Sequence, residues 1–113
     1  MGNGLIKELI RGDDHLVISM VGELTIRTAP GFREYLLDMT TDASGHWVFD
    51  LGEVSYIDSA GVGTLVDLFR RTKSNGTRMS LAGMNRQVLS VFEITKLDRF
   101  FPIFDSVQDA LGS

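Results

Sequence analysis

The stretch Tyr56-Ile57-Asp58-Ser59-Ala60-Gly61-Val62-Gly63 decides how this chain folds, because a strand pattern gives way to a helix pattern within it. Before it, Trp47–Leu51 is β-branched and aromatic, which is typical of a buried strand. After it, apolar residues recur at i, i+3, i+4 and i+7 and predict one face of a helix: Val62, Leu65, Val66 and Phe69. The junction therefore places Asp58 and Ser59 at the start of that helix, at the positive end of its dipole.

Ser59 has two interpretations at this position. Ser and Asp are preferred at helix starts because their oxygens accept hydrogen bonds from unpaired backbone N–H groups, so Ser59 can be a plain N-cap. A hydroxyl held there is also exposed and can carry a phosphate, since anions are favoured at helix N-termini. Gly61 and Gly63 each cost about 1 kcal/mol relative to Ala in a helix, which indicates that a partner protein or a neighbouring strand approaches the backbone. The local sequence leaves both interpretations open.

The rest of the chain alternates strands with helices and contains no repeat or linker. We expect strands near residues 6–10, 16–21, 47–51, 79–82 and 101–104, and helices that begin near Thr28, Ser59, Arg86 and Ser106. This order predicts an α/β fold with a largely parallel sheet and packed α-helices. The turn signal Gly12-Asp13-Asp14 between the first two strands predicts an antiparallel edge, so the sheet is mixed. We expect one domain over residues 1–113.

Two leucines do not fit the apolar stripes of their predicted helices. Leu68 lies off the stripe of the Ser59 helix, and Leu89 lies off the stripe of the helix near residues 86–95. Single exposed apolar residues are common. Leu68 is nevertheless a candidate for a partner-docking surface, because it shares a helix with Ser59.

Composition excludes several classes of site. The chain has 113 residues, of which 43% are hydrophobic, and this content is that of a globular protein. Its net charge of −4 gives no electrostatic case for nucleic-acid binding. The absence of cysteine excludes disulfides, thiolate ligands and thiol catalysis. His15 and His46 flank predicted strands and are interpreted as surface histidines, because no metal-ligand spacing accompanies them.

The motifs do not favour an enzyme or a membrane protein. Gly61-Val62-Gly63 lacks the Lys-Ser/Thr of a phosphate loop and the third glycine of a dinucleotide site, so no cofactor is expected. Asp58 directly precedes Ser59, which is not the geometry of a base oriented toward a nucleophile. The N-terminus lacks the apolar run of a secretory signal, and no stretch approaches the roughly 18 apolar residues of a membrane span. We therefore expect a cytoplasmic protein that does not bind membranes.

The segment from Asp50 to Gly63 resembles the signature of the STAS domain, and specifically that of the bacterial anti-sigma factor antagonists. Three further segments resemble the family in order: Leu16–Leu24 with its Gly-Glu-Leu ending, Arg78–Gly83, and Val88–Phe101. The similarity therefore covers nearly the whole chain. In this family the serine directly after the aspartate is the phosphorylated residue, and Ser59 occupies that place.

The resemblance implies a regulatory protein that works by partner switching. The unphosphorylated form would bind an anti-sigma factor that is also an ATP-dependent serine kinase, and phosphorylation of Ser59 would release it. A metal-dependent serine phosphatase would restore the binding form. The partner-binding residues implied by the resemblance are Glu23, Leu24, Thr25, Asp58, Ser59, Ala60, Gly61, Val62 and Gly63.

Thr25 departs from the family pattern, which usually has an aspartate after Gly-Glu-Leu. The family residue lies in a loop near the phosphorylated serine, so we expect Thr25 to alter partner choice or phosphorylation rate without removing the acceptor. A second function class stays open. Relatives with the same Asp-Ser/Thr-x-Gly loop serve as adaptors in other signalling, secretion or lipid-transport complexes that contain no sigma factor.

Overall fold

In the computed structural model, which describes residues 4–38 and 45–113, five strands form one mixed sheet in the order β1-β2-β3-β4-β5. The strands are β1 (Ile6–Arg11), β2 (His15–Leu24), β3 (His46–Ile57), β4 (Arg78–Ala82) and β5 (Ile103–Phe104). The helices are α1 (Ala29–Leu37), α2 (Ser59–Ser74), α3 (Arg86–Ile94), the 3-10 turn η2 (Leu97–Arg99) and α4 (Val107–Leu111). Only β1 runs antiparallel to its neighbour. The predicted α/β fold, with its mixed and largely parallel sheet, is confirmed.

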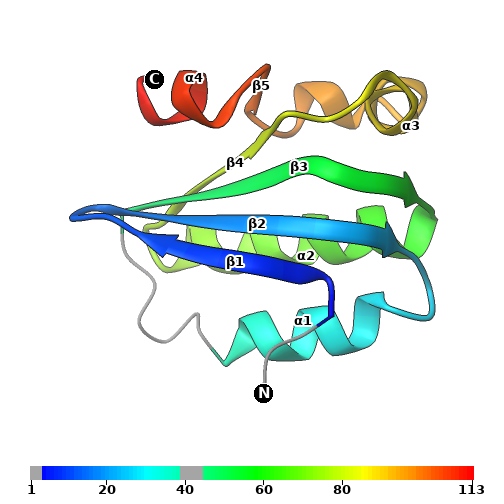
Figure 1. Ribbon diagram of the computed structural model, residues 1–113, viewed down its shortest axis with the longest axis horizontal. Coiled ribbons are helices and arrows are strands. Elements are labelled where there is room, and N and C mark those ends of the chain that lie inside the picture. Colours follow the sequence, from blue (N-terminus) through cyan, green and yellow to red (C-terminus); the bar gives the residue numbers. More distant parts are fainter. Residues whose placement is uncertain (1–3, 39–44) are drawn as a thin grey trace.

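The helices cover the two faces of the sheet separately, with α1 and α2 on one face and α3 and α4 on the other (Figure 1). Because side chains alternate between the faces of a strand, neighbouring residues of β3 enter different cores. Phe49 joins the larger core with Phe32 of α1 and Leu65 of α2. Val48 joins a smaller core with Val17, Ala82 and Ala110, which α4 closes.

β2 and β3 are longer than predicted, and their extra length carries the chain to Ser59. Both sequences contain a Gly-Glu pair, Gly22-Glu23 and Gly52-Glu53, that resembles a turn but lies within a strand. The pairing tolerates these residues because its register shifts between Ser19 and Val21 and again between Gly22 and Glu23, and Gly22 adopts a φ of +97°. The two strands consequently end together, with Leu24 opposite Ile57.

α2 begins at Ser59 and ends at Asn75-Gly76, as predicted, with Gly76 at a φ of +79°. Its buried face differs from the predicted stripe, however, and consists of Gly61, Val62, Thr64, Leu65, Leu68 and Thr72. Leu68 is fully buried, so its proposed place on a docking surface is wrong. Leu89 of α3 is half-buried. Val66 and Phe69, which were expected to face the core, lie at its margin.

His46 is buried, contrary to the surface position predicted for it. Its side chain is 6% exposed, and its Nε2 lies 2.6 Å from the hydroxyl oxygen of Ser80. The strand register places His46 directly between His15 on β2 and Arg78 on β4. Burial, and then the charges of Arg78 and His15, hold the pKa of His46 below its ordinary value.

Candidate functional site

The predicted site residues gather at one end of the sheet, where β2 and β3 stop and α1 and α2 begin (Figure 1). The backbone N–H of Asp58 donates to the carbonyl oxygen of Leu24 at 3.2 Å, which joins the loop after β2 to the start of α2. Glu23, Leu24 and Thr25 are thereby brought beside Asp58–Gly63. The expectation that the two loops are neighbours is confirmed by these contacts.

Asp58 is the N-cap of α2 and connects the two loops through its carboxylate. One oxygen, Oδ1, accepts a hydrogen bond from the backbone N–H of Gly61 at 2.9 Å. The other, Oδ2, accepts one from the backbone N–H of Ile26 at 3.0 Å. Both bonds favour the charged form and hold the pKa of Asp58 below its ordinary value, and the Gly61 bond has the larger effect. The carboxylate is therefore charged and fixed at neutral pH.

Ser59 is the first residue of α2 and is not its cap, since Asp58 takes that role. Its side chain is exposed. No hydrogen bond of the Ser59 hydroxyl is found within residues 4–38 and 45–113. Of the two interpretations of this serine, the plain N-cap is wrong, and the hydroxyl is left accessible at the positive end of the helix dipole.

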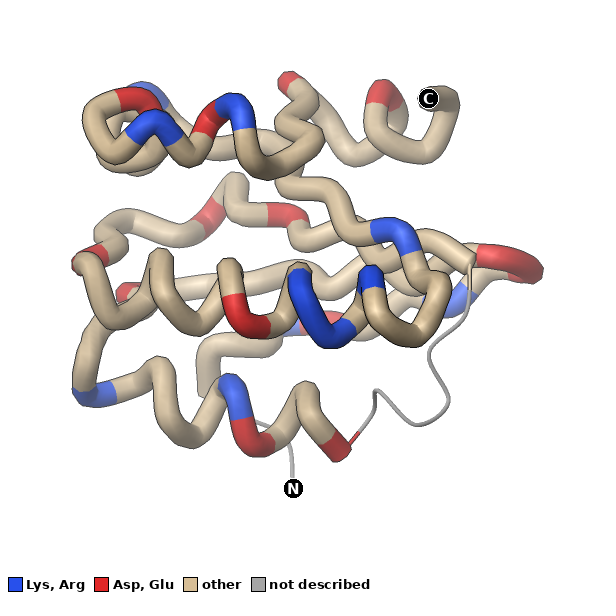
Figure 2. The backbone as a smooth tube through the Cα atoms, turned by 180° about the vertical axis from the view of Figure 1, so that it is seen from behind, with Lys and Arg blue, Asp and Glu red and all other residues tan. Residues whose placement is uncertain are grey.

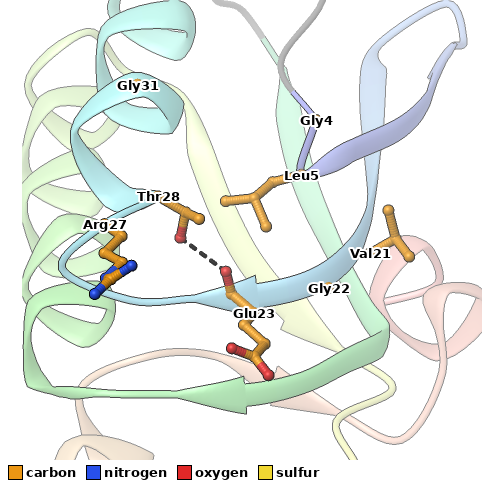
Figure 3. Close-up of a pocket in the computed structure, with 8 residues that line it drawn as sticks. All are labelled: Gly4, Leu5, Val21, Gly22, Glu23, Arg27, Thr28 and Gly31. Carbon is orange, nitrogen blue, oxygen red and sulfur yellow. Dashed lines mark hydrogen bonds between the residues drawn. The ribbon is translucent and has the colours of Figure 1, made fainter.

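The loop from Glu23 to Thr28 is held by its own threonines. Thr25 Oγ1 accepts a hydrogen bond from the backbone N–H of Arg27 at 3.2 Å, a bond that an aspartate can also make. The Thr28 hydroxyl accepts from the backbone N–H of Thr25 at 2.9 Å and donates to the carbonyl oxygen of Glu23 at 2.7 Å (Figure 3). Thr28 occupies the predicted cap position of α1, but its hydroxyl orders the preceding loop and does not cap the helix.

The two glycines of the first turn of α2 differ in their surroundings. A Cβ on Gly61 would lie 2.4 Å from the carbonyl oxygen of Leu24, so the glycine is required by the close approach of β2. A Cβ on Gly63 would meet no atom within 4 Å. The approaching strand therefore explains Gly61, whereas nothing in the structure explains Gly63, which is exposed.

The Ser59 surface comprises the exposed residues Glu23, Ile26, Ser59 and Gly63 and the half-buried residues Thr25, Asp58 and Ala60. Ile26 is 70% exposed, and the sequence does not single it out because one apolar residue in a loop forms no pattern. Leu24, Gly61 and Val62 are buried, so direct contact of these three residues with a partner is not supported.

Two recesses flank the loop between β2 and α1. The first, of about 530 Å³, separates the starts of α1 and α2 and is lined by Ile26, Ala29, Pro30, Arg33, Glu34, Ala60 and Thr64. The second, of about 400 Å³, lies between the starts of β1 and α1 beside Glu23, Arg27 and Thr28 (Figure 3). The surface around Ser59 is thus uneven, with an apolar residue, Ile26, standing at the edge of the first recess.

The described part of the chain offers no metal centre and no membrane-spanning helix. No group of three or more His, Asp or Glu side chains is placed there to hold a metal ion. No helix among the same residues has the length and apolar character needed to cross a bilayer.

Comparison with known proteins agrees with this geometry. The family model described as the STAS domain matches residues 7–110. The anti-sigma-B factor antagonist of Listeria monocytogenes is 35% identical over 98 residues, which are 87% of this chain and 84% of that protein. A crystal structure from Thermotoga maritima superposes with a TM-score of 0.87 at 26% identity and covers 93% of this chain and 91% of that one.

A second crystal structure, of an anti-sigma factor antagonist from Mycobacterium paratuberculosis, shares the fold. Its TM-score is 0.84 at 24% identity, and the match covers 93% of this chain and 89% of that one. The name of the Listeria relative describes an antagonist of an anti-sigma factor. The resemblance noted in the sequence is thereby confirmed, and the chain belongs to the STAS domain family.

Proposed function

We propose that this chain is an anti-sigma factor antagonist that works by partner switching through Ser59. The unphosphorylated form binds an anti-sigma factor with serine kinase activity, and phosphorylation of Ser59 releases it. A metal-dependent serine phosphatase then restores the binding form in the cytoplasm. The proposal rests on the hydroxyl of Ser59 at the start of α2, which is accessible because Asp58 and not Ser59 caps the helix. The name of the Listeria relative and the family match over residues 7–110 support it, and also support one domain over residues 1–113.

A phosphate on Ser59 should change binding more than folding. It adds a charge of about −1.5 to −2 at neutral pH. The start of α2 favours this charge, because the backbone N–H groups of its first turn point toward it. Asp58 already supplies a fixed negative charge one residue away. A partner that covers both groups would have to remove two neighbouring anions from water, and this cost favours release.

The Ser59 surface gives the partner both apolar and polar contacts. Ile26 offers an exposed apolar side chain beside the recess between α1 and α2. Gly63 offers bare backbone, since no atom of the described residues beyond its own helix turn lies within 4 Å of the place a Cβ would take. Glu23 and Thr25 lie on the loop that Asp58 fixes. A partner can therefore approach the backbone of α2 closely, which is the use we propose for Gly63.

Phosphorylation by the cognate kinase with Mg-ATP tests the proposal. We expect one phosphate per chain, which mass spectrometry maps to Ser59, and no incorporation in Ser59→Ala. Ser74→Ala is the matched control, because Ser74 is also an exposed serine of α2 but lies at its other end. Undiminished phosphorylation of Ser59→Ala would show that another residue is the acceptor.

Binding of the kinase tests the switch itself. The phosphorylated protein should bind much more weakly than the unphosphorylated protein, with the same melting temperature. Ser59→Asp should show part of this loss, since aspartate carries less charge and fewer oxygens than phosphate. Equal affinity of the two native forms would rule out partner switching, even if Ser59 is the phosphorylated residue.

A further inference from the structure

A small recess lies at the opposite end of α2 from Ser59. It has a volume of about 200 Å³ and is lined by Phe69, Lys73, Thr77, Arg78, Met79 and Pro102. These residues come from the last turns of α2, the start of β4 and the residue before β5. A helix of 16 residues is about 24 Å long, so this recess is separate from the Ser59 surface.

The walls of the recess are apolar and held in place by packing. Met79 is 2% exposed in the larger core. The ring of Phe69 packs against Phe100 and Phe101, with centroid distances of 4.9 and 5.4 Å. Pockets for drug-sized ligands enclose roughly 300–1,000 Å³, so a recess of this size suits a smaller molecule. A short hydrocarbon chain or a single ring fits these walls.

Thr77 supplies an unsatisfied polar group beside the recess. The residue is 4% exposed, and its hydroxyl oxygen has no hydrogen-bond partner. Every other buried side-chain oxygen or nitrogen of the described residues has one. The nearby buried Thr72, by contrast, donates to the carbonyl oxygen of Phe69 at 3.0 Å. Buried hydroxyls are normally paired. Because Thr77 lines the recess, rotation about its Cα–Cβ bond can turn the hydroxyl toward a bound acceptor.

The rim of the recess is positively charged. Lys73 is exposed in the last turn of α2, and no acidic side chain of the described residues forms an ion pair with it. Arg78 donates to the Ser113 hydroxyl at 2.9 Å, which orients its guanidinium group. Cationic residues gather on this half of α2 (Figure 2). The charge at the rim therefore favours an anion.

We propose that this recess binds a small amphipathic carboxylate. Its apolar part lies against Phe69, Met79 and Pro102, and its carboxylate accepts hydrogen bonds from Lys73 and from the rotated Thr77 hydroxyl. This arrangement pairs the unsatisfied hydroxyl and the unpaired ammonium group with a single ligand. The site is independent of Ser59 phosphorylation.

Titration of the isotope-labelled protein with octanoate, followed by amide chemical shifts, tests this site. We expect saturable shifts at Phe69, Lys73, Thr77 and Met79. Octanol, which keeps the chain without the charge, and acetate, which keeps the charge without the chain, should each bind at least several-fold more weakly. Shifts that do not saturate, or that centre on the exposed Ile26 and Ile94, would mean adventitious adsorption only and would overturn the proposal.

Variants separate the contribution of each polar group. Thr77→Val keeps the shape and removes the hydroxyl, whereas Thr77→Ser keeps the hydroxyl. We expect several-fold weaker octanoate binding by the first variant than by the second. Lys73→Gln should weaken binding similarly, with Lys96→Gln as the control because Lys96 is exposed outside the recess. Unchanged affinity in both Thr77→Val and Lys73→Gln, or octanol binding equal to that of octanoate, would exclude a carboxylate site.

Discussion

At the scale of single residues, Asp58 and Ser59 have different tasks although they are adjacent and both suit a helix start. Asp58 uses both carboxylate oxygens within the protein, on the N–H groups of Gly61 and Ile26. Ser59 uses its hydroxyl for no such bond among the described residues and is exposed. The structural requirement of the helix is therefore met by one residue, and the next residue is available to react.

The two glycines of the first turn of α2 provide a matched prediction. Gly61→Ala should destabilise the protein by about 1–3 kcal/mol, because the added Cβ overlaps the carbonyl oxygen of Leu24. Gly63→Ala should stabilise it by up to about 1 kcal/mol, because alanine favours the helix and meets no atom. Urea unfolding of both variants measures the difference.

The Gly63→Ala variant also tests the role of Gly63 in docking. Kinase affinity should fall for Gly63→Ala even though its stability rises, since the methyl group would occupy the space that the partner backbone needs. A gain in stability with unchanged affinity would show that no partner approaches this glycine closely.

At the scale of elements, the loop after β2 and the start of α2 behave as one unit, because the Asp58 carboxylate spans them. Thr25→Asp should preserve this loop, since an aspartate oxygen can accept the Arg27 N–H bond that Thr25 Oγ1 now accepts. Stability should change by no more than about 0.5 kcal/mol. The added charge should change phosphorylation rate or kinase affinity by a modest factor, because the loop lies beside Ser59.

A double-mutant cycle measures whether Thr25 and Ser59 contact one partner surface. Kinase affinity is compared for Thr25→Asp, Ser59→Ala and the combined variant, and the coupling energy should differ clearly from zero. Thr25→Ser is the control, because it keeps the hydroxyl and adds no charge. A coupling energy near zero would remove Thr25 from the proposed partner surface.

The elements also show which features the sequence could predict. The junction at Ser59 was readable because its strand and helix patterns are both strong. The buried face of α2 was misplaced because Gly61, Thr64 and Thr72 occupy positions that a hydrophobic pattern assigns to surface. Leu68 is buried because α1 and the sheet both pack on α2. Tertiary packing therefore makes the buried face of α2 wider than the apolar stripe in its sequence. The length of β3 was underestimated for a similar reason, since pairing with β2 overrides the local Gly-Glu signal.

At the scale of the whole molecule, the two ends of the sheet carry different ionisable and reactive residues. The strand ends beside α1 and α2 present Asp58 and Ser59. The opposite end contains the row of His15, His46 and Arg78 on three neighbouring strands. Protonation of His46 would place a buried positive charge between Arg78 and His15, and among the described residues Asp14 is the charged group that favours it. The two ends should therefore respond to acid separately.

The pH dependence of stability follows from the two lowered pKa values. The pKa of His46 lies below its ordinary value of 6.5, so the unfolded chain takes up a proton more readily than the folded chain. Stability from this residue is complete above pH 6.5 and falls as the pH drops below it. The pKa of Asp58 lies below 3.8, so its contribution is complete above that pH and is lost as the pH falls further.

Thermal unfolding followed by circular dichroism from about pH 8 to pH 3 should therefore show two declines in melting temperature. His46→Gln should remove the upper decline, and Asp58→Asn should remove the lower one. Asp13→Asn is the matched control for Asp58→Asn, since it changes an aspartate near a strand end. His15→Gln should narrow the upper decline, because the charge of His15 lowers the pKa of His46. If His46→Gln follows the wild-type curve between about pH 7 and pH 5, the buried imidazole does not set the upper decline.

Because His46 and Asp58 lie at opposite ends of β3, the two effects on melting temperature should add in the double variant. A departure from additivity would show that the ends of the sheet are coupled.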